Sequence, residues 1–339
     1  MRLRFACSRI WIFYLLSRQK KKTKMIGAID IGGTKIAVGQ VDDQGRVVSR
    51  LESPTDAARG YSDALERITK MLRETARCNG GKMMGIGIGC TGPVYPLTGE
   101  IGVVDFLPGW QGKNLVADLS QAFQTRVAME NDADAAALGE KIVNAEAAKR
   151  SLIYVTVGTG IGGGIILDGK LYRGVGYSHP EIGHHVIDAT GPQCACGARG
   201  CWEALARGPA MVEWLVGNAP PDYPHRQGLT AQKICELAEQ GDEMARASVN
   251  REAHYLGVGL ANLVTLFTPD VIVLGGSVMG SAHLFWEQIK TTIATSCGYV
   301  PHEKTKVRLA SRGPDAALLG AAQVWYHRFS GNGGGQNDH

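Results

Sequence analysis

The sequence predicts an α/β protein of two domains, and three observations support this prediction. The chain has 339 residues, of which 44% are hydrophobic and 20% are charged, enough for two cores of ordinary size. Two units with the order strand, glycine-rich turn, strand recur about 125 residues apart. A third apolar strand also runs into a Gly-Gly turn, at Gly275 and Gly276. Together they indicate a duplicated design that clamps a nucleotide between two halves.

The first 24 residues differ in charge from the rest of the chain. They carry eight Lys or Arg and no acid, which leaves 28 basic and 32 acidic residues beyond them. Such an acidic body argues against a general nucleic-acid surface. The apolar run 10–16 is too short to span a bilayer and lacks a cleavage site for secretion. We expect a disordered extension ahead of a functional first residue, Met25, and the alternative is a basic membrane tether.

The first unit places a strand at residues 25–30 and a second strand at 36–41, joined by a tight turn. Glycines in the turn let backbone N–H groups approach a phosphate, and a carboxylate at the strand end could hold Mg²⁺ through water. A plain hairpin turn is the alternative. The candidate cofactor-binding residues are Asp30, Gly32, Gly33, Thr34 and Lys35.

The second unit is an apolar strand at 151–157 that enters the glycine-rich stretch 158–164. Its spacing matches G-x-G-x-x-G, the pattern of a dinucleotide site. Such a site needs a helix directly after the glycines, but residues 165–172 predict a hairpin around a D-G turn. We therefore predict a second phosphate turn. Its candidate residues are Gly158, Thr159, Gly160, Gly162 and Gly163, with Gly275 and Gly276 of the third turn admitting a flat adenosine.

Helical periodicity predicts helices at 61–77 and 133–143, and apolar runs predict strands at 84–89 and 126–130. Asn131 and Asp132 follow the second of these strands. A carboxylate there could simply favour a helix start, but it is also suited to act as general base for a sugar hydroxyl. Beyond residue 207 the chain reads as mostly helical. The helices predicted there cover 208–216, 230–240, 243–267, 281–294 and 313–326.

Residues 181–203 hold three cysteines within eight residues and a histidine ten residues upstream. His184, Cys194, Cys196 and Cys201 form a ligand set suited to tetrahedral zinc, and the alternative is a group of buried free thiols. Because Glu181 and Glu203 close the stretch, we expect the metal to fix a loop that presents acidic groups and His184 to hydroxyls. The other cysteines are scattered and odd in number, which indicates reduced thiols and a cytoplasmic protein; they are Cys7, Cys78, Cys90, Cys235 and Cys297.

The motifs D-I-G-G-T-K, N-D-A-D-A-A-A-L-G-E, V-G-T-G-I-G-G-G, E-I-G-H-H, C-A-C-G-A-R-G-C-W-E and V-I-V-L-G-G resemble the ROK family of sugar kinases and repressors. The resemblance covers residues 25–326 and implies an actin-like (ribonuclease H-like) two-domain ATPase fold with a zinc-binding loop. It implies ATP, Mg²⁺ and structural Zn²⁺ as cofactors, a sugar in the cleft and a homodimer, with no nucleic-acid or membrane partner. It also implies a last helix that packs back on the first domain.

Carried over to matching positions, the resemblance makes Asp132 the catalytic base and His184 both a zinc ligand and a sugar ligand. It implies an ATP-dependent kinase acting at the C6 hydroxyl of glucose, or alternatively on N-acetylmannosamine or N-acetylglucosamine. The sequence departs at Asp134, where many members have Asn, and at 104–106, where many have an Asn before L-P-G-W. The implied sugar-binding residues are Gly92, Asn131, Asp132, Glu181, His184 and Glu203.

These inferences divide the chain into an extension, 1–24, a first domain, 25–146, a second domain, 147–327, and a disordered tail, 328–339. A sugar-responsive regulator is the rival class, and it needs a DNA-binding helix-turn-helix for which residues 1–24 are too few. A sugar-binding module without catalysis would require loss of the base, yet Asp132 is present.

Overall fold

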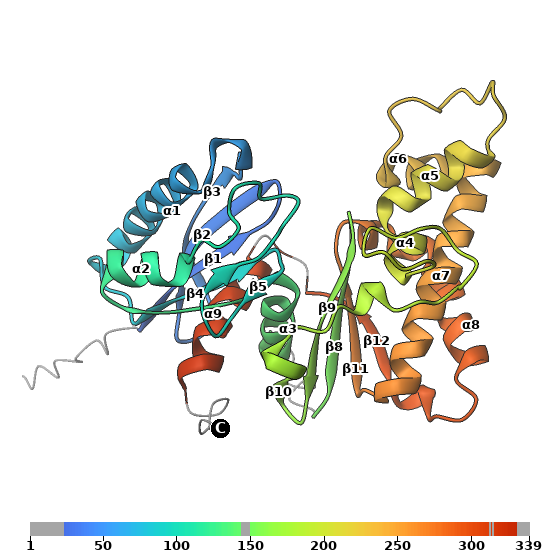
Figure 1. The fold of residues 1–339 in the computed structure, drawn as a ribbon. Coiled ribbons are helices and arrows are strands. Elements are labelled where there is room, and N and C mark those ends of the chain that lie inside the picture. Colours follow the sequence, from blue (N-terminus) through green and yellow to red (C-terminus); the bar gives the residue numbers. More distant parts are fainter. Residues whose placement is uncertain (1–23, 144–149, 312, 314, 331–339) are drawn as a thin grey trace, which may run out of the picture.

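Two five-stranded sheets with the same strand pattern organise the chain (Figure 1). The computed structural model describes residues 24–143, 150–311, 313 and 315–330. All of the predicted extension except Lys24 lies outside the described residues, as do the predicted boundary at 146 and most of the predicted tail. In each sheet three antiparallel strands come first. A fourth strand then pairs parallel with the first, and a fifth pairs parallel with the fourth. The duplicated design expected from the two glycine turns is confirmed.

The first sheet has the order β3-β2-β1-β4-β7. Helices α1 (Tyr61–Ala76) and α2 (Leu115–Phe123) cover one face, where Ile68 and Leu119 belong to a single buried cluster. A two-stranded ribbon, β5 (Val94–Tyr95) and β6 (Glu100–Ile101), leaves the end of β4. The strands are β1 (Met25–Ile31), β2 (Lys35–Asp42), β3 (Val47–Pro54), β4 (Gly85–Cys90) and β7 (Arg126–Asn131).

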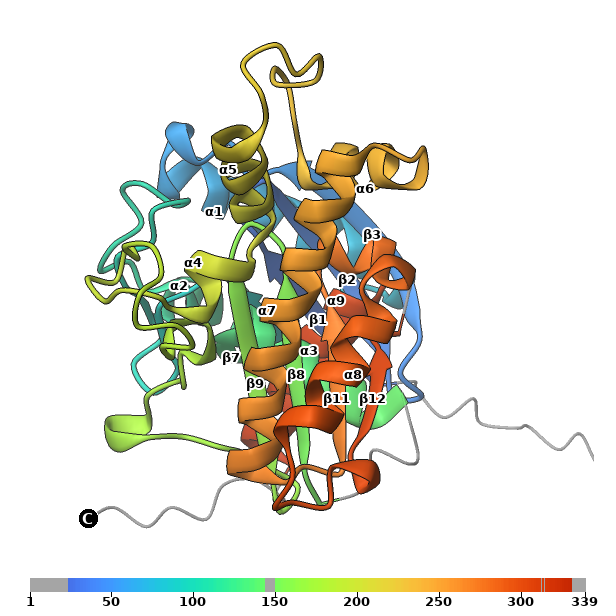
Figure 2. The same ribbon diagram turned by 90° about the vertical axis from the view of Figure 1, so that its right-hand side faces the viewer.

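The second sheet has the order β10-β9-β8-β11-β12, and a layer of helices covers its outer face (Figure 2). Its strands are β8 (Leu152–Val157), β9 (Ile161–Leu167), β10 (Lys170–Leu171), β11 (Val271–Gly275) and β12 (Lys306–Leu309). The covering helices are α4 (Trp202–Ala206), α5 (Gly208–Asn218), α6 (Ala231–Glu239), α7 (Glu243–Phe267) and α8 (Trp286–Ser296).

Helices α3 (Asp132–Val143) and α9 (Ala316–Phe329) lie between the two sheets (Figure 1). The sequence G-I-G-I-G-C of β4 explains how they fit, because its isoleucines face α1 and α2 while its glycines face α9 and α3. A Cβ added at Gly87 would stand 2.0 Å from the carbonyl oxygen of Ala321, and one at Gly85 would overlap Trp325. Period-two glycines on β4 therefore let the last helix pack directly on the first sheet.

Most predicted elements are confirmed, and the differences have physical reasons. The second glycine turn is shorter than predicted, because β9 starts at Ile161 and takes Gly162 and Gly163 into the sheet. Helix α8 begins at Trp286 instead of residue 281, because residues Val278–Leu284 form a 3-10 helix. Helix α9 continues to Phe329, past the predicted boundary at 327. Within the described residues, no helix is long and apolar enough to span a membrane.

Candidate active site

The carboxyl ends of three parallel strands bring the predicted catalytic groups of the first half together. Ile31 of β1 pairs with Cys90 of β4, and Cys90 pairs with Asn131 of β7, so Asp30 and Asp132 lie at the same edge of the sheet. A Cβ added at Gly89 would lie within 4 Å of both aspartates, 3.8 Å from Oδ1 of Asp30 and 3.7 Å from Cα of Asp132. The edge thus forms a carboxylate pair around a glycine.

Burial controls the charge of this pair. Burial, and then the neighbouring charge of Asp132, raises the pKa of Asp30 to about 7. Burial also raises the pKa of Asp132, against a hydrogen bond from the N–H of Ala133 that lowers it. The side-chain oxygen of Asn131 accepts from the same N–H at 2.9 Å, so both residues lie at the start of α3. The charge that each carboxylate exerts on this edge would be offset by a bound cation.

The first glycine turn projects into solvent at the start of β2. Gly32 donates to the carbonyl of Lys35 at 2.9 Å, and Thr55 fixes the turn from outside by donating its hydroxyl to the carbonyl of Gly32. Gly33, Thr34 and Lys35 are exposed, while Lys35 also pairs with Glu52 at 2.7 Å. The exposed backbone of the turn is free to receive an anion.

The second turn, Gly158–Gly160, is tied to the cysteine-rich stretch. Oε2 of Glu203 accepts from the N–H of Ile161 at 2.9 Å, and a Cβ at Gly160 would stand 2.5 Å from that oxygen. Glu203, predicted only as a sugar ligand, therefore also anchors the turn. Gly162 and Gly163, predicted in the turn, lie in β9, where Gly163 packs against Ile182.

A cavity of about 780 Å³ opens beside the second turn. Gly158 and Thr159 form one end of it, and the starts of α5 and α6 form its walls. Sequence reasoning missed these walls, although a Gly-Pro pair that opens a helix is a signal for close backbone approach. The missed lining residues include Gly208, Pro209, Glu213, Thr230 and Gln232.

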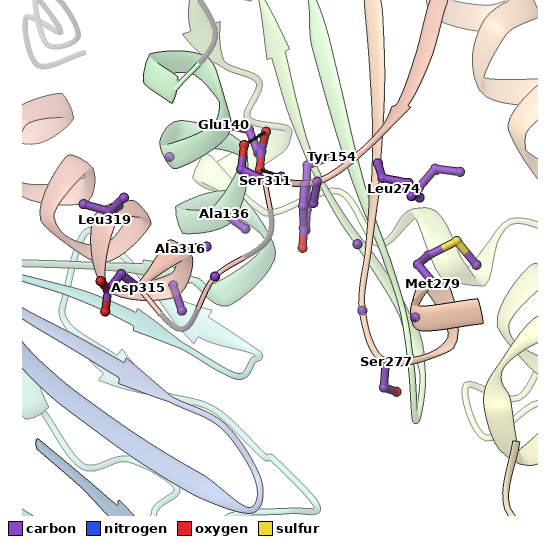
Figure 3. Close-up of a pocket in the computed structure, with 18 of the residues that line it drawn as sticks. Ala136, Glu140, Tyr154, Leu274, Ser277, Met279, Ser311, Asp315, Ala316 and Leu319 are labelled. Carbon is purple, nitrogen blue, oxygen red and sulfur yellow. Dashed lines mark hydrogen bonds between the residues drawn. The ribbon is translucent and has the colours of Figure 1, made fainter. Parts of the chain in front are cut away.

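The Gly-Gly turn after β11 lines a second cavity of about 780 Å³, which shares Ser277 and Gly280 with the first. Figure 3 shows residues that line this second cavity. There Tyr154 extends from β8, and Glu140 of α3 accepts a hydrogen bond from the backbone of Ser311 at 2.6 Å. A Cβ at Gly275 would lie 2.2 Å from the hydroxyl of Tyr154, and Gly276 has φ +92° against Val157. Packing within the protein therefore requires both glycines, whatever ligand they meet.

The four predicted metal ligands meet at one point. Ligand atoms of His184, Cys194, Cys196 and Cys201 all lie within 4.8 Å of one another. Nδ1 of His184 is 3.5 Å from Sγ of Cys194, and Sγ of Cys196 is 3.5 Å from Sγ of Cys201. Ligands on a tetrahedral zinc stand about 3.5 to 3.8 Å apart at the usual bond lengths, so the set fits zinc.

The metal-ligand stretch is positioned by glycine turns and by one buried ring. Gly200 has φ +74°, and a Cβ there would lie 1.5 Å from the carbonyl of Asp188. Trp202, directly after Cys201, is fully buried against Gly259 of α7. Nε2 of His184 lies 4.0 Å from Oε1 of Glu203, on the ring side away from Cys194. One ring nitrogen thus faces the cysteines and the other faces Glu203.

Two of the remaining predicted sugar ligands line a third cavity, of about 490 Å³. Asn131 of the first half and Glu181 of the second half both line it, and a Cβ at Gly92 would lie 2.7 Å from the side-chain nitrogen of Asn131. His184 and Glu203 are not among its lining residues. The structure therefore brings Asn131 and Glu181 around one space, with Gly92 behind Asn131, and holds His184 with Glu203 as a separate pair.

Comparison with known proteins identifies relatives over nearly the whole chain. The ROK family matches residues 26–328. A glucokinase of Streptomyces coelicolor is 33% identical over 310 residues, 87% of this chain and 96% of that protein. A ROK hexokinase from Thermus thermophilus has a TM-score of 0.78 at 35% identity, covering 88% of this chain and 97% of its own. A ROK family glucokinase from Streptomyces griseus, in complex with glucose and AMPPNP, has a TM-score of 0.74 at 31% identity, covering 88% and 98%.

Proposed function

The chain belongs to the ROK family, and we propose that it is an ATP-dependent hexose kinase that phosphorylates the C6 hydroxyl of glucose. One observation carries the proposal. The half-buried residue Asp132 follows Asn131, which lines a cavity shared by both halves, and it shares its sheet edge with Asp30. We take 25–146 and 147–327 as the two domains that enclose the substrates.

Asp132 acts as the general base in this proposal. Phosphoryl transfer needs little covalent help from a protein, so a positioned acceptor for the hydroxyl proton and a fixed sugar are its main contributions. Burial raises the pKa of Asp132, which makes the carboxylate a stronger base than a solvated one. Asn131, Glu181, His184 and Glu203 would hold the other hydroxyls, because carboxylates, an amide and an imidazole can each pair with them.

The nucleotide occupies the cavity at the second turn in this proposal. Its base would lie against Gly208 and Pro209, and its phosphates would run toward Thr159 and the first turn. Asp30 would hold Mg²⁺, and the raised pKa of this carboxyl fits a site where a cation offsets the charge of two aspartates. When bound, Mg²⁺ neutralises charge on the transferring phosphoryl group.

Zinc would be held by His184, Cys194, Cys196 and Cys201, whose spacing fits the ion. Four protein ligands leave no open position, so its task would be structural. The orientation of His184 supports this division, because the ring nitrogen that faces away from the cysteines points toward Glu203. The metal would thereby fix the imidazole and the loop that carries it.

A second substrate class is N-acetylated hexosamines, favoured by the 490 Å³ cavity. This cavity continues past Asn131 and Glu181 to Tyr95, Pro96 and Leu97, where an acyl group would find apolar surface. A sugar-responsive regulator without catalysis is disfavoured, because a protein that only binds sugar does not need the general base that Asp132 would provide.

An assay of ADP release tests the proposal. The purified protein is given ATP, Mg²⁺ and one sugar at a time from glucose, mannose, fructose, allose, N-acetylmannosamine and N-acetylglucosamine. We expect sugar-dependent ADP release with glucose and a phosphorylated product at C6. Release that is equal with and without every sugar would overturn the kinase proposal.

A further inference from the structure

Four ionisable side chains form a buried cluster beside the cavity that Asn131 and Glu181 line. They are Glu130, Asp134, Arg173 and His179. Arg173 donates to Glu130 and lies 3.0 Å from Oδ2 of Asp134, and Nδ1 of His179 lies 2.7 Å from that same oxygen. Their side chains are between 0% and 13% exposed. Charges buried this deeply persist only where each has a partner of opposite sign.

The cluster joins the first half of the chain to the second half, beside the cavity that Asn131 and Glu181 line. Glu130 is the second-last residue of β7, and Asp134 lies in the first turn of α3, two residues after the proposed base, Asp132. Arg173 and His179 belong to the segment that follows β10, and Glu181 comes two residues after His179. The bond between His179 and Asp134 thus connects the turn that carries the base to the segment that carries a proposed sugar ligand.

Other contacts hold this segment in one conformation. The guanidinium of Arg173 lies 5.3 Å from the ring centre of Tyr177, and Arg328 of α9 approaches the same ring at 5.9 Å. Tyr177 has φ +66°, a backbone conformation that a bulky residue keeps only when its surroundings enforce it. Burial alone would lower the pKa of His179, but its hydrogen bond and the charge of Asp134 raise it, which favours the charged pair.

We propose that Asp134 and His179 are positioning residues for the sugar, because their hydrogen bond sets the place of Glu181 relative to Asp132. This inference rests on the proposed kinase function. His179 lines the same cavity as Asn131 and Glu181, so a shift of the segment would alter the shape of the sugar site directly. The nucleotide cavity, lined by other residues, would keep its shape.

The test compares two substitutions of one residue. His179→Ala removes the bond to Asp134 while leaving Arg173 to compensate the buried carboxylates, and His179→Asn keeps a donor near the position of Nδ1. We expect His179→Ala to raise the KM for sugar about 10- to 100-fold, the scale of a small misplacement, with the KM for ATP changed less than about 2-fold. His179→Asn should restore most of the sugar affinity and stays measurable if the alanine variant does not fold.

Asp168→Asn is the matched control, because Asp168 pairs with Arg150 at 2.7 Å on the surface, with both side chains more than 70% exposed. It should leave both KM values unchanged. Calorimetric titration of glucose into the same proteins measures sugar binding without turnover, so it separates the two proposals. A wild type that binds sugar but releases no ADP contradicts the kinase function alone. Equal sugar affinity in wild type, His179→Ala and Asp168→Asn overturns the positioning role, and so does a KM that rises equally for sugar and ATP.

Discussion

At the scale of single residues, the proposed chemistry depends on two aspartates at the edge of the first sheet. Asp30 and Asp132 flank Gly89, and burial raises the pKa of both carboxyls. A carboxyl whose pKa is raised by burial keeps its proton to higher pH than a solvated one, so activity that needs the carboxylate must fall as pH decreases through that raised pKa.

Asp132→Asn tests this reading. The amide keeps the shape and the contact with the N–H of Ala133 but accepts no proton from the sugar. We expect turnover to fall by about 100-fold or more while glucose binding is largely kept, the usual scale for loss of a general base. The acidic limb of the wild-type pH profile, measured as kcat/KM, should be absent from the remaining activity.

Asp168→Asn again provides the control for a change from Asp to Asn at an exposed ion pair. Turnover near the wild-type value together with a collapse of glucose affinity would make Asp132 a binding residue and would contradict the assigned role.

Candidate functional residues could be predicted from the sequence only where they form a local pattern. Asp132 is detectable because it follows an apolar strand and precedes an apolar helix. The four candidate metal ligands are detectable because three cysteines lie close together in the sequence. The buried ion-pair cluster could not be predicted in this way, because its members come from both halves of the chain and spread over 50 residues, too far apart for a local sequence pattern. They are Glu130, Asp134, Arg173 and His179. Glu203 shows the same limit, because its bond to the N–H of Ile161 exists only in the folded chain.

At the scale of elements, the stretch between Glu181 and Trp202, which holds the four candidate zinc ligands, consists mainly of turns and has little regular secondary structure. Only a short 3-10 helix, Ile182–His184, and two isolated bridges occur there. Its backbone hydrogen bonds close turns and loops, such as the bond from the N–H of Cys194 to the carbonyl of Ala198 at 2.8 Å. A bound metal would join these turns and so would contribute to the stability of the stretch. Helix α4, which follows directly, connects it to the core through Trp202.

Cys196→Ala should therefore weaken the binding of sugar more than the binding of ATP. We expect loss of stoichiometric zinc, a lower melting temperature and weaker glucose binding, because apparent zinc-binding free energies of about 10 kcal/mol or more are partly folding free energy. Binding of a non-hydrolysable ATP analogue should change less. Elemental analysis and separate titrations of the two ligands measure each effect.

Cys78→Ala removes an exposed thiol outside this stretch and should leave zinc content and both affinities unaltered. Glucose affinity that survives complete loss of zinc from Cys196→Ala would show that the metal stabilises the fold without shaping the sugar site.

Elements with a strong apolar pattern were predicted and weakly buried ones were not. Helix α7 begins and ends at the predicted residues, whereas β3 was missed because none of its residues is fully buried. Helix α2 has only Leu115 and Leu119 buried, too few to give a periodic signal over nine residues. Strand β12 lies at a sheet edge and likewise has no buried residue.

At the scale of the whole molecule, α3 and α9 form the connection between the two sheets. The two helices cross at Gly139 of α3 and Gly320 of α9. The approach is close, since a Cβ added at Gly139 would lie 3.0 Å from Cα of Gly320. A Cβ at Gly320 would in turn stand 2.4 Å from the carbonyl oxygen of Ala135, one turn along α3 from Asp132. Close packing of these helices thus helps to hold the start of α3, which carries the proposed base, in position.

Gly320→Ala should force α9 away from α3. Because the obstacle is backbone, we expect a loss of about 1 to 3 kcal/mol in the free energy of unfolding and a lower turnover. Gly217→Ala is the matched control, since Gly217 lies in α5 with no atom within 4 Å of an added Cβ. It should be neutral or stabilising by about 0.5 to 1 kcal/mol.

Chemical denaturation of both variants measures these differences, and the assay of ADP release measures turnover. Equal stability of the two variants would show that α9 adapts to the added methyl group and that the glycine crossing is not required. The resemblance to the family implied a last helix on the first domain, and α9 packs on β1 and β4 of the first sheet. Composition and periodicity alone could not place that helix, because its partners lie nearly 300 residues earlier.

The position of α9 has a consequence for synthesis on the ribosome. The apolar face formed by Ile26, Ala28 and Val41 is among the first parts of the described chain to be made, yet Leu318 and Trp325 cover it. During translation this face stays uncovered while nearly all of the second sheet and its helices emerge and fold. We therefore expect the amino-terminal sheet to be the last part of the nascent protein to become resistant to proteases, and to depend longest on chaperones.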